Sequence, residues 1–410
     1  MITRQQFLAA LIAAVVAAVP VAAAKEAPPP AKKAAQPAPA VKKDDLPITA
    51  PHAILIDAEN GSVLFERNAD ELIFPASLAK LMTVEYVLHL IKEGKLKLTD
   101  EFPVSENAWR KGGAPSHSST MFAALNSQID VDSLLHAVII QSANDACIVL
   151  AEGIAGSEAE FAAKLTQRAR EIGLTKSVFT NSNGLPDPGT KVTSRELAML
   201  ARTIILNYPT FYPIFGQAEF TWNKIRQQNR NPLLPLVTGA DGLKTGFTNE
   251  AGYGLVGSAV QDGLRLIVVV NGEKSAKERA DEGKKLLEWG FHNFEQRVLF
   301  AEGQTIGYAK VFGGATGSVP LTASGAVRIM VPKAGGEKIT ARIVYTGPVP
   351  APVAEGTPVG ALKVWRNENL VLEQPLKTSA SVGRGNISQR AIDGVSELMI
   401  GLFRAGAERL

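Results

Sequence analysis

Residues 74–80 read Phe-Pro-Ala-Ser-Leu-Ala-Lys and place Ser77 and Lys80 three positions apart, at the start of an apolar, periodic segment. Two residues three apart on a helix share one face, one turn from each other. A serine hydroxyl is a poor nucleophile until a neighbour takes its proton, and a lysine with a lowered pKa can be that neighbour. Such a pair is common by chance, so its meaning depends on the rest of the chain.

The segment around Ser77 predicts a largely buried helix. Pro75 suits a first helical turn, and apolar side chains recur at helical spacing from Leu78 to Ile91. Further helices are predicted at residues 158–172, 194–206 and 276–293, and two hairpins at residues 52–57 with 62–67 and 253–260 with 264–270. Helices enclosed by strands at both ends indicate an α/β or α+β domain over about residues 46–295.

Ser142-Ala143-Asn144 is a second motif that suits the chemistry of Ser77. Acyl transfer needs a proton relay to the leaving group besides a nucleophile and a base. Ser142 can relay a proton to a leaving amine. Asn144 can orient Lys80 and hold a substrate carbonyl.

Lys244-Thr245-Gly246 is the third motif. Lys244 and Thr245 can bind a carboxylate, and Gly246 lets a strand approach the substrate closely. We expect burial and the charge of Lys244 to lower the pKa of Lys80. The oxyanion hole would consist of the backbone N–H of Ser77 and of one near Phe247.

Each motif alone has a plain structural interpretation, such as a helix cap, a turn or a strand end. Three motifs in the order and spacing of one known kind of site are unlikely to coincide by chance. This set of motifs is found in β-lactamases and penicillin-binding proteins.

Composition argues against several other classes of protein. The chain has 410 residues, 46% of them hydrophobic, and a net charge of +3, which suits two or three globular domains and gives no sign of a nucleic-acid partner. The histidines show no zinc-ligand spacing, and no Gly-x-Ser-x-Gly elbow occurs. We therefore expect no metal and no cofactor. Cys147 is the single cysteine, so no intrachain disulfide can form.

The N-terminal region has the pattern of an exported protein. Residues 1–24 resemble a signal peptide, with Arg4, an apolar run and Ala22-Ala23-Ala24 as a cleavage site. Residues 25–45 are rich in Ala, Pro and Lys, a linker composition. We expect the mature protein in the periplasm.

The C-terminal region has a different pattern from the first domain. Residues 296–385 alternate short apolar runs with Gly and Pro turns, which predicts a small all-β domain without a cluster of catalytic groups. Residues 386–410 form an amphipathic helical stripe. Such a helix can lie on the outer surface of the cytoplasmic membrane, or it can pack on the β domain or on another copy of the chain.

The motifs taken together resemble the D-alanyl-D-alanine carboxypeptidases, the low-molecular-mass penicillin-binding proteins of bacterial envelopes. Beyond the three triplets, the similarity includes the sequences of residues 75–83, 141–147, 225–231, 241–253 and 284–290. The resemblance implies an antiparallel sheet flanked by helices, with an all-helical subdomain. It also implies removal of the terminal D-alanine from peptidoglycan pentapeptides through an acyl-enzyme on Ser77, and acylation by β-lactam antibiotics.

The resemblance also suggests residues that contact the substrate carboxylate. Arg279 corresponds to a family arginine near that group, and Arg226 is a second candidate, although either could be a surface arginine in an ion pair. The family often has glycine where Ala143 stands and histidine where Phe247 stands. Phe247 removes a possible polar contact, which affects substrate rate and antibiotic preference rather than the reaction.

The sequence leaves three alternatives to a carboxypeptidase, and two of them use the same motifs. A β-lactamase needs a carboxylate-activated water, for which the loop at residues 181–189 offers Asp187 and no glutamate. A D,D-endopeptidase would cut cross-links with the same residues, and the sequence does not separate it from a carboxypeptidase. An inactive envelope-binding protein would not need the intact set of Ser77, Lys80, Ser142, Asn144 and Lys244.

Overall fold

The computed structural model describes residues 48–391. The predicted signal peptide at 1–24, the linker at 25–45 and residues 392–410 of the predicted tail helix lie outside the described residues. In the described part of the chain, no helix is both long enough and apolar enough to cross a bilayer.

A five-stranded sheet organises the first domain. Its strands are β1 (His52–Asp57), β2 (Val63–Arg67), β7 (Ala240–Thr248), β8 (Gly252–Gln261) and β9 (Leu264–Glu273), in the order β2-β1-β9-β8-β7. Every neighbouring pair is antiparallel. The two predicted hairpins are confirmed, and β7 lies at one edge of the sheet.

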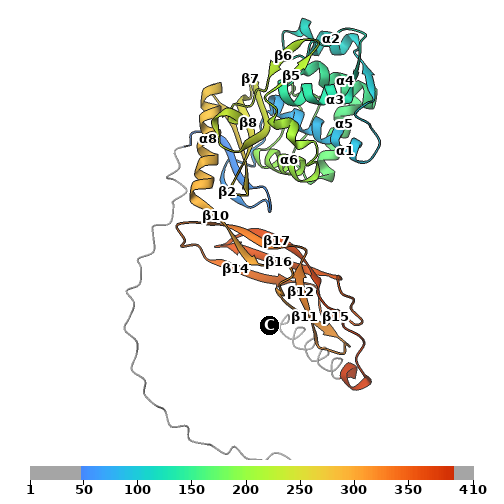
Figure 1. Ribbon diagram of the computed structural model, residues 1–410, viewed down its shortest axis with the longest axis vertical. Coiled ribbons are helices and arrows are strands. Elements are labelled where there is room, and N and C mark those ends of the chain that lie inside the picture. Colours follow the sequence, from blue (N-terminus) through green and yellow to red (C-terminus); the bar gives the residue numbers. More distant parts are fainter. Residues whose placement is uncertain (1–47, 392–410) are drawn as a thin grey trace, which may run out of the picture. The chain divides into compact units, whose positions relative to one another are not determined.

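Alternating side chains of the strands bury both faces of this sheet, as the two-residue period of a strand requires. Leu55 packs with Leu286 and Leu287 of α8 (Ala276–Asn293). Its neighbours Ile54 and Ile56 join the large core beneath the other helices. Figure 1 shows α8 on one side of the sheet and the helical part of the domain on the other.

The helical part combines longer α-helices with short helical segments. It comprises η2 (Ala76–Ala79), α1 (Lys80–Lys92), α2 (Glu106–Gly112), η3 (Ala114–Ser116), α3 (Val131–His136), η4 (Ala137–Gln141), α4 (Asn144–Ala155), α5 (Glu158–Glu171), α6 (Ser194–Asn207) and η5 (Tyr212–Gly216). The short helix α7 (Leu233–Leu236) instead lies on the α8 side of the sheet, where Leu233 joins the core that contains Leu286. Two small hairpins accompany them, β3 (Glu101–Pro103) with β4 (Gln128–Asp130) and β5 (Glu219–Trp222) with β6 (Ile225–Gln228). Thr193 caps the N-terminus of α6, because its side chain accepts a hydrogen bond from the backbone N–H of Glu196.

The start of the helix at Ser77 differs from the expectation. Residues 76–79 form a 3-10 turn, and the α-helix begins only at Lys80. Ala76 has a φ of +48°, a left-handed conformation that is uncommon for a residue other than glycine. Ser77 therefore lies on a tight turn that leads into the helix, rather than in a regular first α-helical turn.

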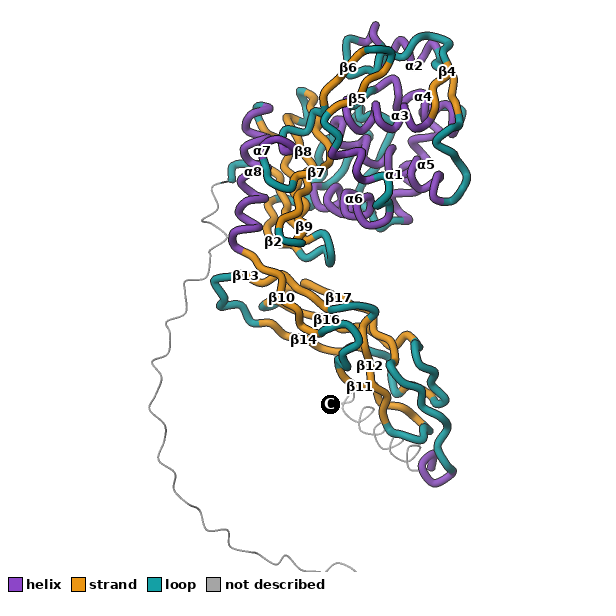
Figure 2. Tube along the Cα trace, viewed as in Figure 1, coloured by secondary structure: helices purple, strands orange, loops and turns teal. Residues whose placement is uncertain are grey.

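The second domain consists of strands, as the sequence predicted. A two-stranded sheet pairs β10 (Phe294–Phe300) with β13 (Val327–Pro332). A six-stranded sheet has the order β14-β16-β17-β12-β11-β15. Its strands are β11 (Gly307–Phe312), β12 (Ser318–Ala323), β14 (Ile339–Val344), β15 (Val349–Pro350), β16 (Pro358–Arg366) and β17 (Asn369–Thr378). They enclose an apolar core of their own, and Figure 2 shows that this domain is built mainly from strands and loops.

Candidate active site

The turn η2 and the helix α1 bring Ser77 and Lys80 into direct contact. The Nζ of Lys80 donates a hydrogen bond to the Oγ of Ser77 at 2.9 Å and another to the backbone carbonyl of Asn183 at 2.6 Å. Lys80 is 0% exposed, whereas Ser77 is partly exposed. The prediction that Ser77 and Lys80 lie on one face, next to each other, is confirmed. The carbonyl of Asn183 has no side-chain signature and lies 103 residues further along the chain, so the sequence did not indicate it.

Burial changes the acid–base behaviour of Lys80. Desolvation lowers its pKa to about 8, and the positive charge of Arg230 acts in the same direction. Cys147 and Asp145 oppose this shift as anions. However, burial raises the pKa of the Cys147 thiol to about 12, so this thiol is neutral at pH 7 and cannot stabilise a charged lysine there. Lys80 can therefore lose its proton near neutral pH.

Ser142 and Asn144 lie where the helical segment η4 gives way to α4. Ser142 has a φ of +65°, and this left-handed residue turns the chain between the two segments. The Ser142 side chain is 2% exposed, and neither its Oγ nor the Oδ1 of Asn144 has a hydrogen-bond partner among the described residues. A buried polar atom without a partner is costly in free energy, so these two oxygens are suited to a bound substrate or water.

A serine-rich loop before α3 holds Asn144 from the other side. The Nδ2 of Asn144 donates to the Oγ of Ser118 at 2.9 Å, and its backbone N–H donates to the carbonyl of Ser119 at 2.7 Å. Ser118 was not among the residues expected in the site. The run Ser116-His-Ser-Ser119 was the available signal, but serine runs are usually ordinary loops.

Asp145 fixes this loop in place. Its carboxylate accepts hydrogen bonds from the Thr120 hydroxyl at 2.5 Å and from the backbone N–H groups of Met121 and Ala123 at 3.0 and 3.1 Å. The residue next to Asn144 thereby attaches the loop that contacts Asn144. The sequence does not reveal this arrangement, since both Met121 and Ala123 donate through their backbone N–H groups.

The strand β7 presents the third motif to the turn that bears Ser77. A Cβ added to Gly246 would lie 3.0 Å from the carbonyl oxygen of Pro75 and 3.1 Å from the backbone nitrogen of Leu78. A glycine therefore allows the strand to lie directly against η2. In this structure Gly246 lets β7 lie close to the turn that bears Ser77. The predicted close approach of β7 to the substrate stays a prediction.

Lys244 is buried beside these groups, and its Nζ donates to the carbonyl of Thr245 at 3.0 Å. Burial lowers the pKa of Lys244 well below its ordinary value, and the positive charges of Lys80, Arg230 and Arg279 add to this effect. The charge of Lys80 thus lowers the pKa of Lys244, but the expected effect of Lys244 on the pKa of Lys80 is not found, and Arg230 is the cation that lowers it. For the pKa of Lys80, burial is the largest cause.

The two predicted arginines have different surroundings. Arg279 on α8 has a buried Nε without a hydrogen-bond partner among the described residues, and its guanidinium lies 5.6 Å from the ring centroid of Tyr253. Phe247, which is 47% exposed, stacks on the same Tyr253 ring with centroids 4.1 Å apart. Arg226 instead forms an ion pair with Glu219 on the exposed β5–β6 hairpin.

Arg230, four residues beyond Arg226, is the arginine of this segment that acts on the site. It donates to the Oγ of Ser119 at 2.5 Å, and its charge lowers the pKa of both Lys80 and Lys244. Both arginines belong to the sequence at residues 225–231 that prompted the expectation. The sequence alone did not show that Arg226, and not Arg230, pairs with Glu219 in the folded hairpin.

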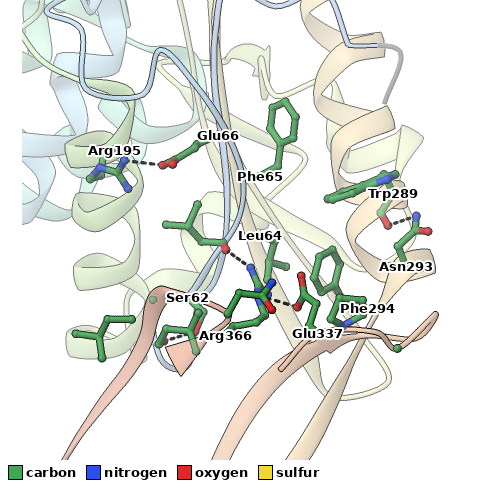
Figure 3. Close-up of a pocket in the computed structure, with 17 residues that line it drawn as sticks. Ser62, Leu64, Phe65, Glu66, Arg195, Trp289, Asn293, Phe294, Glu337 and Arg366 are labelled. Carbon is green, nitrogen blue, oxygen red and sulfur yellow. Dashed lines mark hydrogen bonds and ion pairs between the residues drawn. The ribbon is translucent and has the colours of Figure 1, made fainter. Parts of the chain in front are cut away.

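A cavity of about 480 Å³ elsewhere in the molecule is a different feature. Its wall includes Glu66, which pairs with Arg195 at 2.6 Å, and Arg366, which pairs with Glu337 at 3.1 Å (Figure 3). None of the predicted site residues lines it. The candidate active site is therefore the cluster around Ser77.

Comparisons with known proteins agree with this arrangement. Residues 35–275 match the family model of D-alanyl-D-alanine carboxypeptidase, peptidase S11, and residues 294–384 match that of the C-terminal domain of penicillin-binding protein 5. The chain is 40% identical to the D-alanyl-D-alanine carboxypeptidase DacC of Escherichia coli, over 83% of this chain and 86% of that protein. It is 34% identical to DacA of the same organism, over 84% and 87%.

Solved structures give the same result. Penicillin-binding protein 5 from Haemophilus influenzae superimposes with a TM-score of 0.73 at 37% identity, covering 82% of this chain and 98% of that one. Penicillin-binding protein D2 from Listeria monocytogenes, in its ampicillin-bound form, matches with a TM-score of 0.52 at 31% identity over 60% of this chain and 99% of that one. The chain belongs to the D-alanyl-D-alanine carboxypeptidase family, peptidase S11, and is a serine-type D-Ala-D-Ala carboxypeptidase.

Proposed function

We propose that Ser77 is the nucleophile of this carboxypeptidase and that Lys80 is its base. The observation that carries the proposal is the contact of 2.9 Å between the Lys80 Nζ and the Ser77 Oγ, made by a lysine with no exposed surface. Neutral Lys80 takes the hydroxyl proton while the Oγ attacks the carbonyl carbon of the penultimate D-alanine of a peptidoglycan pentapeptide. The oxyanion is held by the backbone N–H groups of Ser77 and Phe247.

The second half of the reaction returns the proton. As the tetrahedral intermediate collapses, the C–N bond breaks, and the proton on Lys80 passes through the Ser142 hydroxyl to the leaving amine of D-alanine. Asn144 would hold a group of the substrate with its unpartnered Oδ1, whereas the carbonyl of Asn183, rather than Asn144 as expected, orients Lys80. Water then attacks the ester carbonyl, Lys80 accepts a proton from that water, and the shortened peptide leaves as Ser77 regains its proton.

The C-terminal carboxylate of the substrate would bind to Lys244, Thr245 and Arg279. The unpaired Nε of Arg279 and the crowded positive charges around Lys244 favour an anion at this place. Binding of the carboxylate would raise the pKa of Lys244 and keep it charged. Because the charge of Arg230 already acts on the site, this arginine is a better candidate than Arg226 for a role in substrate binding.

β-Lactams would acylate the same serine, since their strained amide presents a carbonyl and a carboxylate in a similar arrangement. The ampicillin-bound structure of the Listeria relative supports this assignment for a protein of the same fold. The resulting ester would persist as long as water attacks it slowly. The rate of this hydrolysis separates a penicillin-sensitive carboxypeptidase from a β-lactamase.

We also propose that the protein is exported and lies on the outer face of the cytoplasmic membrane through residues 386–410. The signal-like residues 1–24 and the amphipathic stripe of the tail support this location. The substrate of the enzyme, the peptidoglycan peptide, is found in that compartment.

Mass spectrometry of the purified protein with a pentapeptide that ends in D-Ala-D-Ala tests the proposed reaction. We expect a tetrapeptide and free D-alanine, and an acyl-enzyme on the tryptic peptide that contains Ser77. Release of D-alanine without any adduct at Ser77, when the reaction is quenched in acid during turnover, would contradict the proposed mechanism. A cross-linked dimer peptide supplied in parallel distinguishes endopeptidase activity.

A further inference from the structure

Three side chains connect the edge strand β7 to the helix α8. Phe247 on β7 lies opposite Tyr253 on β8, and their rings stack with centroids 4.1 Å apart. The guanidinium of Arg279 on α8 lies 5.6 Å from the centroid of the same Tyr253 ring. We name Phe247, Tyr253 and Arg279 the Arg279 stack. The Tyr253 ring is its central member, because it contacts both the strand of the third motif and the arginine.

The Arg279 stack lies on the same face of the sheet as the side chain of Thr245. Gly246 faces the turn η2, because a Cβ on it would meet the backbone of that turn. Successive side chains of a strand point to opposite faces, so Thr245 and Phe247 both point to the other face. Leu255, the cross-strand partner of Thr245, packs there in one core with Leu286 of α8. The stack therefore lies on the α8 side of β7, next to the threonine of the carboxylate-binding pair.

No anionic side chain occupies the guanidinium of Arg279. Within residues 48–391 it forms no ion pair, and its buried Nε has no hydrogen-bond partner. The neighbouring acidic side chains on α8 have other partners. The Oε2 of Glu278 accepts the backbone N–H of Lys274 at 3.1 Å. The Oε1 of Glu282 pairs with the ammonium of Lys285 at 2.9 Å. An aromatic face attracts a cation without accepting its N–H groups in hydrogen bonds, so the donors of Arg279 stay available to an incoming anion.

An arginine held by a ring is prepared for a carboxylate. A long, flexible side chain loses conformational freedom when it binds a ligand, and this loss weakens binding. The Tyr253 ring reduces the loss, because it restricts the side chain of Arg279 before the substrate arrives. Burial, which lowers the pKa of Arg279, makes an anionic partner favourable at the same place. An acidic residue at position 253 would also restrict the arginine, but it would compete with the substrate carboxylate.

We propose that Tyr253 is a positioning residue of the reaction, whose ring holds the guanidinium of Arg279 beside Thr245 for the C-terminal carboxylate of the substrate. Phe247 supports the ring from β7 through the stacking contact. Tyr253 itself does not touch the carboxylate and acts through Arg279. This inference rests on the proposed role of Arg279 in binding the substrate carboxylate, and it adds the residue that orients this arginine.

Two peptides separate this positioning role from a general structural one. Both are N-acetylated tripeptides that end in D-Ala-D-Ala, one with a free C-terminal carboxylate and one with a C-terminal amide. We expect Tyr253→Leu to lower kcat/KM for the free-carboxylate peptide about threefold to thirtyfold, the range that corresponds to loss of a cation–π contact. The loss should appear as a higher KM, with kcat within about twofold of the unmodified protein. The amide peptide brings no anion, so its kcat/KM should also stay within about twofold.

Further variants assign the effect to the ring and to Arg279. Tyr253→Phe keeps the ring and should react with both peptides like the unmodified protein. Tyr308→Leu, the same substitution at a tyrosine of β11 that is 65% exposed, is the matched control and should change neither peptide. Arg279→Ala should lower kcat/KM for the free-carboxylate peptide at least about tenfold, as loss of a hydrogen bond between charged groups does. Adding Tyr253→Leu to Arg279→Ala should cause no further loss, because Tyr253 acts through the arginine.

The outcomes distinguish the two proposals. If Arg279→Ala leaves the free-carboxylate peptide unaffected, the proposed role of Arg279 is wrong. If Arg279→Ala has the expected effect and Tyr253→Leu has none, the positioning role alone is overturned. It is also overturned if a folded Tyr253→Leu protein loses activity equally toward both peptides, if Tyr253→Phe loses as much, or if the losses in the double variant are additive. Circular dichroism checks folding, and Tyr253→Met, with its adaptable side chain, takes the place of a leucine variant that does not fold.

Discussion

At the scale of single residues, burial explains how Lys80 can act as a base. An exposed lysine is almost fully charged at pH 7, whereas Lys80 has no exposed surface and a pKa of about 8. At neutral pH about a tenth of the molecules would carry the neutral amine. Its hydrogen bond to Ser77 then allows this small fraction to take the hydroxyl proton.

This acid–base behaviour predicts the pH dependence of acylation. The neutral form of Lys80 increases with pH, so the second-order rate of penicillin acylation should rise about tenfold per pH unit well below pH 8 and level off above it. Stopped-flow measurement between pH 5.5 and 9.5 checks this profile. A rate that is flat from pH 6 to 8 would show that Lys80 is not the base.

A substitution at Lys80 separates its positive charge from its basicity. Arginine keeps a positive charge but does not lose its proton in this pH range. We expect Lys80→Arg to slow penicillin acylation by about a hundredfold to ten-thousandfold at every pH, the range that a general base contributes. Circular dichroism should show whether the variant is folded. Acylation by a folded variant at a near-normal rate would contradict the assignment.

Single residues also show what the sequence can predict. The contact between Ser77 and Lys80 follows from their separation of three positions. Which of Arg226 and Arg230 acts on the site depends on how the β5–β6 hairpin is folded, because Glu219 on the paired strand forms an ion pair with Arg226. That is a tertiary fact, and a motif of seven residues does not contain it.

At the scale of elements, the site depends on loops that pack against the nucleophile turn. The sequence predicted both hairpins of the central sheet and the helices α5, α6 and α8, because apolar side chains recur regularly over the whole length of these segments. It did not indicate the left-handed Ala76 or the contact of Gly184 with it. Close backbone contacts between distant loops leave little trace in apolar periodicity.

Gly184 offers a test of this packing. We expect Gly184→Ala to destabilise the protein by about 2 kcal/mol or more, because a Cβ would both meet the Ala76 carbonyl and occupy a left-handed position. Penicillin acylation should slow at least about tenfold, since a loop shift would move the carbonyl that holds Lys80. Urea unfolding and labelled-penicillin kinetics measure the two effects.

Gly156→Ala is the matched control for this prediction. Gly156 has a φ of +79°, but a Cβ on it would have no atom within 4 Å. It should therefore lose only about 1 kcal/mol of stability and keep its acylation rate. Equal acylation rates in the two variants would show that the packing of the loop at Gly184 does not support catalysis.

At the scale of the whole molecule, the catalytic groups and the β domain depend on separate cores. The residues around Ser77 belong to the sheet and helices of the first domain, whereas the strands of the second domain enclose their own apolar cluster. The sequence predicted this division from the change of apolar period near residue 296. It did not predict the strand order of the six-stranded sheet, which depends on pairings between distant segments.

The proposed location leads to a prediction about the tail. Removal of residues 386–410 should transfer the protein from the membrane fraction to the soluble fraction, because the apolar stripe of that segment is the proposed anchor. Penicillin acylation by the truncated protein should remain within about twofold of the full chain, since the catalytic groups lie in a separate core. Fractionation and immunoblotting check the location. An unchanged membrane fraction would refute the anchor.

The central claim is that Ser77 is acylated with the help of Lys80. The most direct measurement is peptide mapping by mass spectrometry after brief exposure to a penicillin, for the full protein and for Ser77→Ala. We predict an adduct of the mass of the intact penicillin on the peptide that contains residue 77, and none in the variant. An adduct on another residue, or one that persists in a folded Ser77→Ala protein, would contradict the account.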